Sequence, residues 1–254
     1  MTRVLLFSLL LWGAACTDKK PATPAPLRNA PMRLEPLERV LPADAGERDA
    51  VFDVAPFTPV GPEAPANAVK VPLEGDKPLA FDVKTAAKDV PVLLVPVGDT
   101  YLAQVQGTLA ALEDAGLEVW LAHPDGAIAW KLTLRDEKEF QMWLEQIEPG
   151  KLRVIQRADG FELSTNMGKL PGGDPNGPSV PARGGKMDLA TLQKGLKKLK
   201  SRFDAAPDVC FMPSYGTELA DVARAMAANA TAADAMIFPG ICLVYPRPKP
   251  APAK

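Results

Sequence analysis

Side chains that could perform metal or nucleophilic chemistry are few in this chain. It has three cysteines, Cys16, Cys210 and Cys242, and a single histidine, His123. A zinc site usually takes four Cys, His or carboxylate ligands, and with Cys16 expected to be lipidated the ligands besides His123 would have to come from Cys210, Cys242 and carboxylates. His123 begins a His-Pro-Asp-Gly sequence with the proline and glycine positions of a type I turn, which predicts a surface turn residue. We therefore predict no metal and no cofactor.

No motif indicates a catalytic nucleophile or a phosphate-binding loop. None of the serines has a Gly-x-Ser-x-Gly context. The glycines of Gly172-Gly173 and Gly184-Gly185-Lys186 lack Walker spacing and a preceding strand, which favours a flexible loop. We predict a binding or scaffolding protein without catalytic residues. A hydrolase of unknown type is the enzymatic alternative.

Cys210 and Cys242 leave two interpretations open. Both lie in predicted strands of one small sheet, and an oxidising compartment would permit a disulfide between them. The strand order is not known at this point, and the two side chains could face opposite sides. Unpaired buried cysteine is also common in protein cores. A disulfide and two ordinary core residues both remain consistent with the sequence.

The stretch from Asp188 to Phe203 predicts an amphipathic helix with a basic outer face. Its inward positions are Leu189, Leu192, Leu196, Leu199 and Phe203. The outer face carries Lys194, Lys197, Lys198, Lys200 and Arg202. Lys194, Lys197, Lys198 and Arg202 form a candidate surface for anionic glycan or lipid headgroups, and the alternative is a solvated helix face. The net charge of the whole chain is only -2, which does not favour nucleic acid as a partner.

The N-terminal residues predict export and lipid attachment. Arg3, a short apolar run and three small residues make residues 1–15 a signal peptide. Cys16 directly after Ala14-Ala15 resembles the lipidation site of bacterial lipoproteins, which implies a palmitate-bearing membrane anchor. The alternative is secretion with a free thiol. Thr17 resembles the residue after the cysteine in lipoproteins sorted to the outer membrane. We expect a periplasmic protein anchored in the outer membrane of a Gram-negative cell envelope.

Residues 16–68 are rich in proline and predict an extended tether that acts as a plain spacer, although Leu34–Leu41 and Ala50–Val60 carry enough apolar residues to dock locally. Residues 246–254 predict a disordered tail. Between them, a shift of 117 residues superimposes a Pro-x-x-x-Thr-x-Leu-Ala-x-Val pattern at Pro96 on the same pattern at Pro213. An apolar strand precedes each copy. We therefore predict an internal repeat, with one unit at 69–150 and another at 151–245.

Periodicity and turn residues predict an α/β (α+β) fold of two small units, each a sheet with two helices. The elements expected in the first unit are a hairpin (69–71 and 79–83), strands at 90–95, 117–122 and 128–134, and helices at 99–116 and 136–147. Those of the second are a hairpin (152–156 and 161–164), helices at 188–203 and from 217, and strands at 209–212 and 241–245. The short connection before Val90 has no room for a helix. We therefore expect the 136–147 helix to cover the sheet face around Val92 and Leu94.

The order of elements from Leu152 to Tyr245 resembles the periplasmic domain of the ExbD/TolR family. The residues that carry the resemblance are Arg157-Ala158-Asp159-Gly160, the Asp188–Leu199 helix pattern, Met212-Pro213 with Thr217, the Val222–Met226 helix face and Ile241-Cys242-Leu243-Val244. The first unit is similar to a degenerate copy without its first helix.

The resemblance implies a module that dimerises or binds envelope components such as peptidoglycan. Family members work in biopolymer transport from a membrane helix that carries a protonatable carboxylate. The N-terminal apolar segment here has no Asp or Glu, so a proton-driven stator is not expected. An accessory subunit of an ExbB/ExbD- or Tol-type transmembrane transport system is the alternative.

Overall fold

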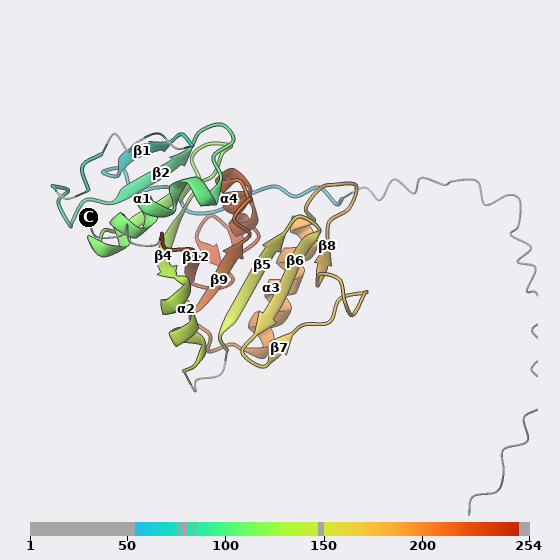
Figure 1. The fold of residues 1–254 in the computed structure, drawn as a ribbon. Coiled ribbons are helices and arrows are strands. Elements are labelled where there is room, and N and C mark those ends of the chain that lie inside the picture. The colour runs from blue at the N-terminus through green and yellow to red at the C-terminus, as the bar shows by residue number, and fades with distance from the viewer. Residues whose placement is uncertain (1–53, 76, 78–80, 84, 147–149, 249–254) are drawn as a thin grey trace, which may run out of the picture. The chain divides into compact units, whose positions relative to one another are not determined.

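A single mixed sheet carries the fold. The computed structural model describes residues 54–75, 77, 81–83, 85–146 and 150–248, all within one compact unit. The sheet has ten strands in the order β1-β2-β3-β4-β12-β9-β5-β6-β7, with β8 also paired to β6 (Figure 1). The fold is therefore mixed α/β, and strands from both predicted units share the same sheet.

The strands and helices follow the chain in a regular order. The strands of the sheet are β1 (Val69–Leu73), β2 (Val92–Pro96), β3 (Val119–Ala122), β4 (Ala129–Asp136), β5 (Leu152–Arg157), β6 (Gly160–Thr165), β7 (Gly168–Lys169), β8 (Val180–Pro181), β9 (Asp208–Pro213) and β12 (Gly240–Tyr245). The helices are α1 (Leu102–Asp114), α2 (Glu137–Leu144), α3 (Leu189–Arg202) and α4 (Leu219–Ala227). A small hairpin of β10 (Ala230–Ala232) and β11 (Ala235–Met236) follows α4.

Two blocks of three parallel strands lie on either side of β4. We call β1-β2-β3 the first block and β5-β9-β12 the second block; all pairings within each are parallel. Because β4 is antiparallel to β3 and parallel to β12, the two blocks run in opposite directions. Each block contains one strand–helix–strand crossover, β2-α1-β3 in the first and β9-α4-β12 in the second.

The two crossovers meet at the positions that the sequence shift of 117 residues relates. Leu102 N donates to Thr217 O at 3.0 Å, and Leu219 N donates to Thr100 O at 2.8 Å. Tyr101 and Glu218 form the β-bridge between these two bonds. Each bond is the counterpart of the other after the shift, so the repeated motif places the starts of α1 and α4 in a reciprocal backbone pairing.

Three helices cover one face of the sheet, which we call the first face. α1, α3 and α4 bury their apolar sides together with the strand residues Val209, Phe211, Ile241 and Leu243. α1 begins after Tyr101 rather than after the predicted Asp99 or Thr100, and Gln104 Oε1 accepts from Tyr101 N at 2.9 Å. Gly116 ends α1 with a φ of 63°, as the sequence predicted.

The opposite side of the sheet, the second face, has different covers over the two blocks. Alternation along a strand places Cys210, Cys242 and Val244 on this face, where Phe140 and Trp143 of α2 pack against them. Over the first block, Ala64 and Ala68 pack against Leu93, Ala122 and Ala129. The expectation that α2 would cover the first unit around Val92 and Leu94 was wrong, because those two residues face α1 on the first face.

Segments near both ends of the described chain also differ from what the sequence predicted. β1 pairs in parallel with β2, and residues 81–83 form no strand, so the hairpin predicted at 69–83 was wrong. Part of the predicted tether lies on the sheet, where Ala129 N donates to Pro62 O at 2.9 Å. Arg247, in the predicted tail, contacts Glu113, Asp114 and Asp136, with its nearest nitrogen–oxygen distance 2.6 Å.

Within the described ranges, none of the helices is long and apolar enough to cross a membrane.

Candidate anion-binding groove

The basic helix α3 is fixed at both ends. Asp188 accepts hydrogen bonds from Thr191 N at 2.9 Å and from Thr191 Oγ1 at 2.8 Å, which caps the first turn. At the other end, Lys200 Nζ donates to Asp204 O at 2.6 Å and to Ala206 O at 3.0 Å. Leu192, Leu196 and Leu199 are fully buried beneath the helix. The remaining basic side chains therefore project from a helix whose position is well defined.

A groove of about 270 Å³ runs between α3 and the segment from Leu163 to Val180. Leu163, Leu170, Pro171 and Val180 line it on the strand and loop side. Lys194, Lys198 and Arg202 line it on the helix side. The loop lies close against β6 at this point, behind which α3 packs (Figure 1). The groove thus combines an apolar wall with a basic wall.

Lys194, Lys198 and Arg202 form one stripe along α3, because residues four apart share a helix face. All three side chains are exposed, and they form no hydrogen bond or ion pair with any residue of the described part of the chain. Lys197 is equally exposed but does not line the groove. Of the four predicted residues, the structure therefore brings three together and leaves one apart.

The hydroxyl groups in the groove are already engaged. Ser179 Oγ donates to Leu170 O at 2.7 Å and accepts from Leu163 N at 3.1 Å. Thr191 Oγ1 donates to Asp188 Oδ2 at 2.8 Å. The donors that remain for a ligand are the two ammonium groups and the guanidinium group of the stripe. Such a site selects anionic ligands.

Larger hollows on the molecule select no charge. One of about 610 Å³ lies beside α1, and Asp82, Asp114 and Lys88 line it together with alanine, valine and leucine. Charges of both signs are present there, so neither an anion nor a cation is favoured. The α3 groove, by contrast, is lined by three cations and by no carboxylate.

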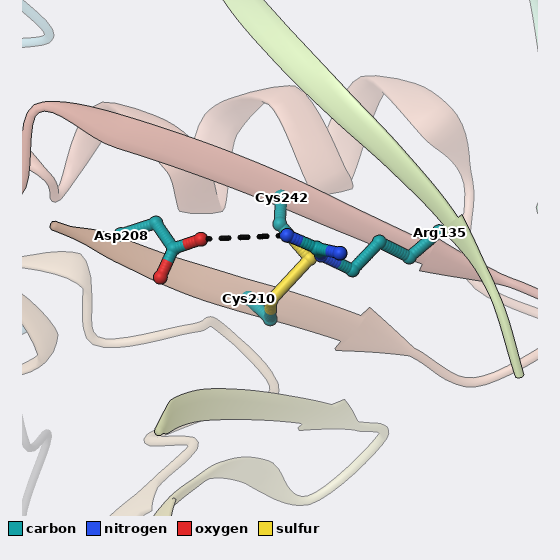
Figure 2. Close-up of a disulfide and its surroundings, with 4 residues drawn as sticks. All are labelled: Arg135, Asp208, Cys210 and Cys242. Atoms are coloured by element: carbon teal, nitrogen blue, oxygen red, sulfur yellow. Dashed lines mark ion pairs between the residues drawn. A yellow bond between two sulfur atoms is a disulfide. The ribbon is translucent and has the colours of Figure 1, made fainter. Parts of the chain in front are cut away.

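The structure joins Cys210 and Cys242 in a disulfide. The two residues lie directly opposite each other on β9 and β12, with their Cα atoms 4.3 Å apart. Figure 2 shows the Arg135 side chain reaching across the disulfide toward Asp208, at 3.8 Å. Burial raises the pKa of the Asp208 carboxyl, although Arg135 and Lys151 oppose that shift. This cluster is covered by α2 on the second face, whereas α3 packs on the first face. Cys16, the predicted lipidation site, lies outside the described residues.

His123 was wrongly expected at the surface. The predicted turn is present, since Gly126 N donates to His123 O, but the side chain of His123 is only 3% exposed. Its Nδ1 accepts from Asp125 N at 3.2 Å, and burial lowers its pKa. In the part of the chain that the structure describes, no three His, Cys, Asp or Glu side chains come together to hold a metal ion.

Comparisons with known proteins return no match: no protein family, curated protein or solved structure is significantly similar to this chain. The resemblance to the ExbD/TolR family therefore remains a prediction. The sequence indicated the basic helix, but it gave no signal for the groove. The groove depends on where the Gly/Pro-rich segment after β6 returns, and Ser179 holds that return through its bonds to Leu163 and Leu170.

Proposed function

We propose that this protein is a periplasmic lipoprotein of the bacterial cell envelope that binds an anionic envelope component through the α3 groove and catalyses no reaction. The ligand would be peptidoglycan or a member of an envelope transport complex. The observation that carries the proposal is the stripe of Lys194, Lys198 and Arg202, whose side chains line the groove without a partner among the residues that the structure describes. Three cations on one wall repel one another, so an anion there is favoured.

Two further observations support an envelope location. Cys210 and Cys242 form a disulfide in the core, and such bonds persist mainly in oxidising compartments such as the periplasm. Cys16 follows a short apolar segment and two alanines, as in exported lipoproteins. Lipid attachment at Cys16 would leave the folded unit on a proline-rich connection to the membrane.

We also propose that the two halves arose by duplication of an ExbD/TolR-like unit. The reciprocal pairing of Leu102 with Thr217 and of Leu219 with Thr100 supports this, because equivalent residues make equivalent bonds. The absence of a carboxylate from the N-terminal apolar segment argues against proton-driven work. An accessory role in an ExbB/ExbD- or Tol-type transport system fits the same features. A homodimer remains the alternative arrangement if the groove is not the binding surface.

The anchor is tested in cells. Wild-type protein should incorporate labelled palmitate and fractionate with membranes, and Cys16→Ser should abolish labelling. Unlabelled wild-type protein in the soluble fraction would contradict the lipoprotein proposal.

The binding role is tested with purified peptidoglycan sacculi and by crosslinking in the envelope. The full chain carrying Lys194→Glu, Lys198→Glu and Arg202→Glu should lose sedimentation with sacculi or its crosslinked partner. A matched variant, Lys70→Glu, Lys138→Glu and Lys197→Glu, changes the net charge equally at exposed positions outside the groove. Equal losses in both variants would show a general charge effect and overturn the proposed site.

A further inference from the structure

We propose that the α3 groove takes an extended segment of a partner protein in which acidic and apolar side chains alternate. This narrows the ligand of the proposed function to a protein, and it rests on that function. It is supported by the spacing of the basic stripe, the chemistry of the two walls and the rigidity of the loop.

The spacing of the stripe matches an extended chain. Each step from Lys194 to Lys198 to Arg202 advances four residues along α3. A helix rises 1.5 Å per residue, so the three positions are about 6 Å apart and span about 12 Å. In an extended strand, every second side chain shares a face, at intervals of about 6.7 Å. Three alternating carboxylates would therefore span about 13 Å and meet the three cations one to one.

The two walls favour a peptide over a sugar chain. The wall facing the stripe is apolar: Leu170 and Pro171 are accessible there, above the buried Leu163 and Val180, and can receive the apolar side chains between the acidic ones. No aromatic side chain lines the groove within the described residues, and the hydroxyls of Ser179 and Thr191 are engaged in the fold. A glycan would bring many hydroxyls and find few partners for them.

A membrane surface fits less well than a peptide. A bilayer would attract every exposed lysine on the outer face of α3, Lys197 included, and it would make no use of a recessed apolar wall. The affinity of a ligand bound in the groove should not depend on Lys197. This difference separates the two ligands by experiment.

The loop that forms the outer wall is internally fixed. Lys169 Nζ donates to Pro175 O at 3.2 Å and also to Gly177 O, which ties the loop to β7. At Gly172 an added Cβ would lie 2.5 Å from Pro178 O, so the two arms of the loop are in contact. The groove is thus formed before a ligand arrives, which lowers the entropic cost of binding.

The experiment measures binding of labelled peptides to the full chain by fluorescence anisotropy. One probe alternates Glu and Val over three repeats, and a permuted probe of the same composition has its glutamates contiguous. We expect the alternating probe to bind more tightly. The triple Lys194→Glu, Lys198→Glu, Arg202→Glu variant should weaken it by at least about tenfold, as expected for three reversed ion pairs. Lys197→Glu should change the affinity less than about twofold.

The controls separate failure of this inference from failure of the proposed function. Circular dichroism and an intact Cys210–Cys242 disulfide verify folding, and a variant with Lys194→Gln, Lys198→Gln and Arg202→Gln is milder. Equal binding of both probes would overturn the alternating-chain inference. Binding to phosphatidylglycerol vesicles that Lys197→Glu weakens as much as Lys198→Glu would identify a membrane surface instead and overturn it. Binding to sacculi without peptide binding would overturn this inference alone and leave the proposed function standing.

Discussion

The two parallel blocks differ most on the second face of the sheet. In the second block, Cys210 on β9 lies opposite Cys242 on β12, and the two are covalently joined. The residue equivalent to Cys210 in the first block is Leu93 on β2, which lies opposite Trp120 on β3. On this face, the two strands of one crossover are therefore joined by a covalent bond, and those of the other by the contact of two apolar side chains.

The covers over these two pairs differ as well. Over the disulfide, α2 contributes Phe140 and Trp143, and the cations of Arg135 and Lys151 lie 5.4 Å and 4.7 Å from the Trp143 ring. Over Leu93, the cover is an irregular segment that contributes only Ala64 and Ala68. The strand–helix–strand frame therefore fixes the first face, where the helices pack. The frame does not fix the second face, which α2 covers over the second block and the segment with Ala64 and Ala68 covers over the first.

Removal of the disulfide should have the largest effect. It joins residues 32 apart in sequence, and the chain-entropy model predicts that a loop of this length contributes about 3–4 kcal/mol. We expect Cys210→Ala with Cys242→Ala to lower the free energy of unfolding by that amount in urea titrations. Reductant should destabilise the wild type to a similar extent and leave the double variant unchanged. A double variant as stable as oxidised wild type would contradict the role of the bond.

The equivalent change in the first block should be smaller and insensitive to reductant. Leu93 is 6% exposed, and Leu→Ala in a core costs about 2–5 kcal/mol, with the low end expected beneath a thin cover. We therefore expect Leu93→Ala to lower the free energy of unfolding by about 2–3 kcal/mol. Met142→Ala, at a side chain 52% exposed, is the control and should change it by less than about 0.5 kcal/mol. A Leu93 effect as small as that of Met142 would show that the 60–68 segment does not seal the second face.

Local patterns in the sequence predicted the first face better than the second. Alternation at Ile128–Leu134 predicted β4, the Ala-Asp-Gly turn predicted the β5–β6 hairpin, and Asp188 with its leucines predicted α3. Each of these signals is contained in one element. The repeat also predicted which positions of the two crossovers are equivalent, and the reciprocal bonds at Thr100 and Thr217 connect those positions.

The contacts that the sequence did not predict are those between distant segments. β1 pairs in parallel with β2, and no hairpin turn in the sequence indicates such a pairing. Ala64 is placed on Leu93 by tertiary packing alone. The same holds for the groove: the basic side chains were evident, but the return of the loop at Pro171 and Ser179 was not. The facing of Cys210 and Cys242 required the strand order, which no local pattern supplies.

The matched threonines of the two crossovers offer a third test. Thr100 is buried, its Oγ1 lies 2.8 Å from Leu73 O and 2.7 Å from Val97 O, and it accepts from Gly75 N at 3.1 Å. Thr217 Oγ1 has one partner, Ser214 Oγ at 2.8 Å, at an exposed site. Thr→Val leaves buried partners unsatisfied only at position 100, so we expect a loss of about 1–3 kcal/mol for Thr100→Val and less than about 1 kcal/mol for Thr217→Val. Thermal unfolding of the two variants measures the difference, and equal losses would show that the two crossovers are held alike.

The smallest effect concerns His123, which follows β3 in the first half. Burial lowers its pKa, so the folded protein binds this proton less tightly than the unfolded chain does. The stability it contributes is complete above the unfolded pKa of about 6.5 and is lost as the pH falls toward the lower folded value. His123→Asn offers an oxygen to Asp125 N and does not titrate in this range.

Between pH 7.5 and 5.5, we expect the wild type to lose more stability than the His123→Asn variant, by less than about 1.4 kcal/mol per pH unit, the limit for one proton. Asp208 and Glu139, whose pKa values burial raises, are present in both proteins and cancel in the comparison. Parallel stability curves for the two proteins across this range would show that His123 takes up its proton as readily in the folded state as in the unfolded chain.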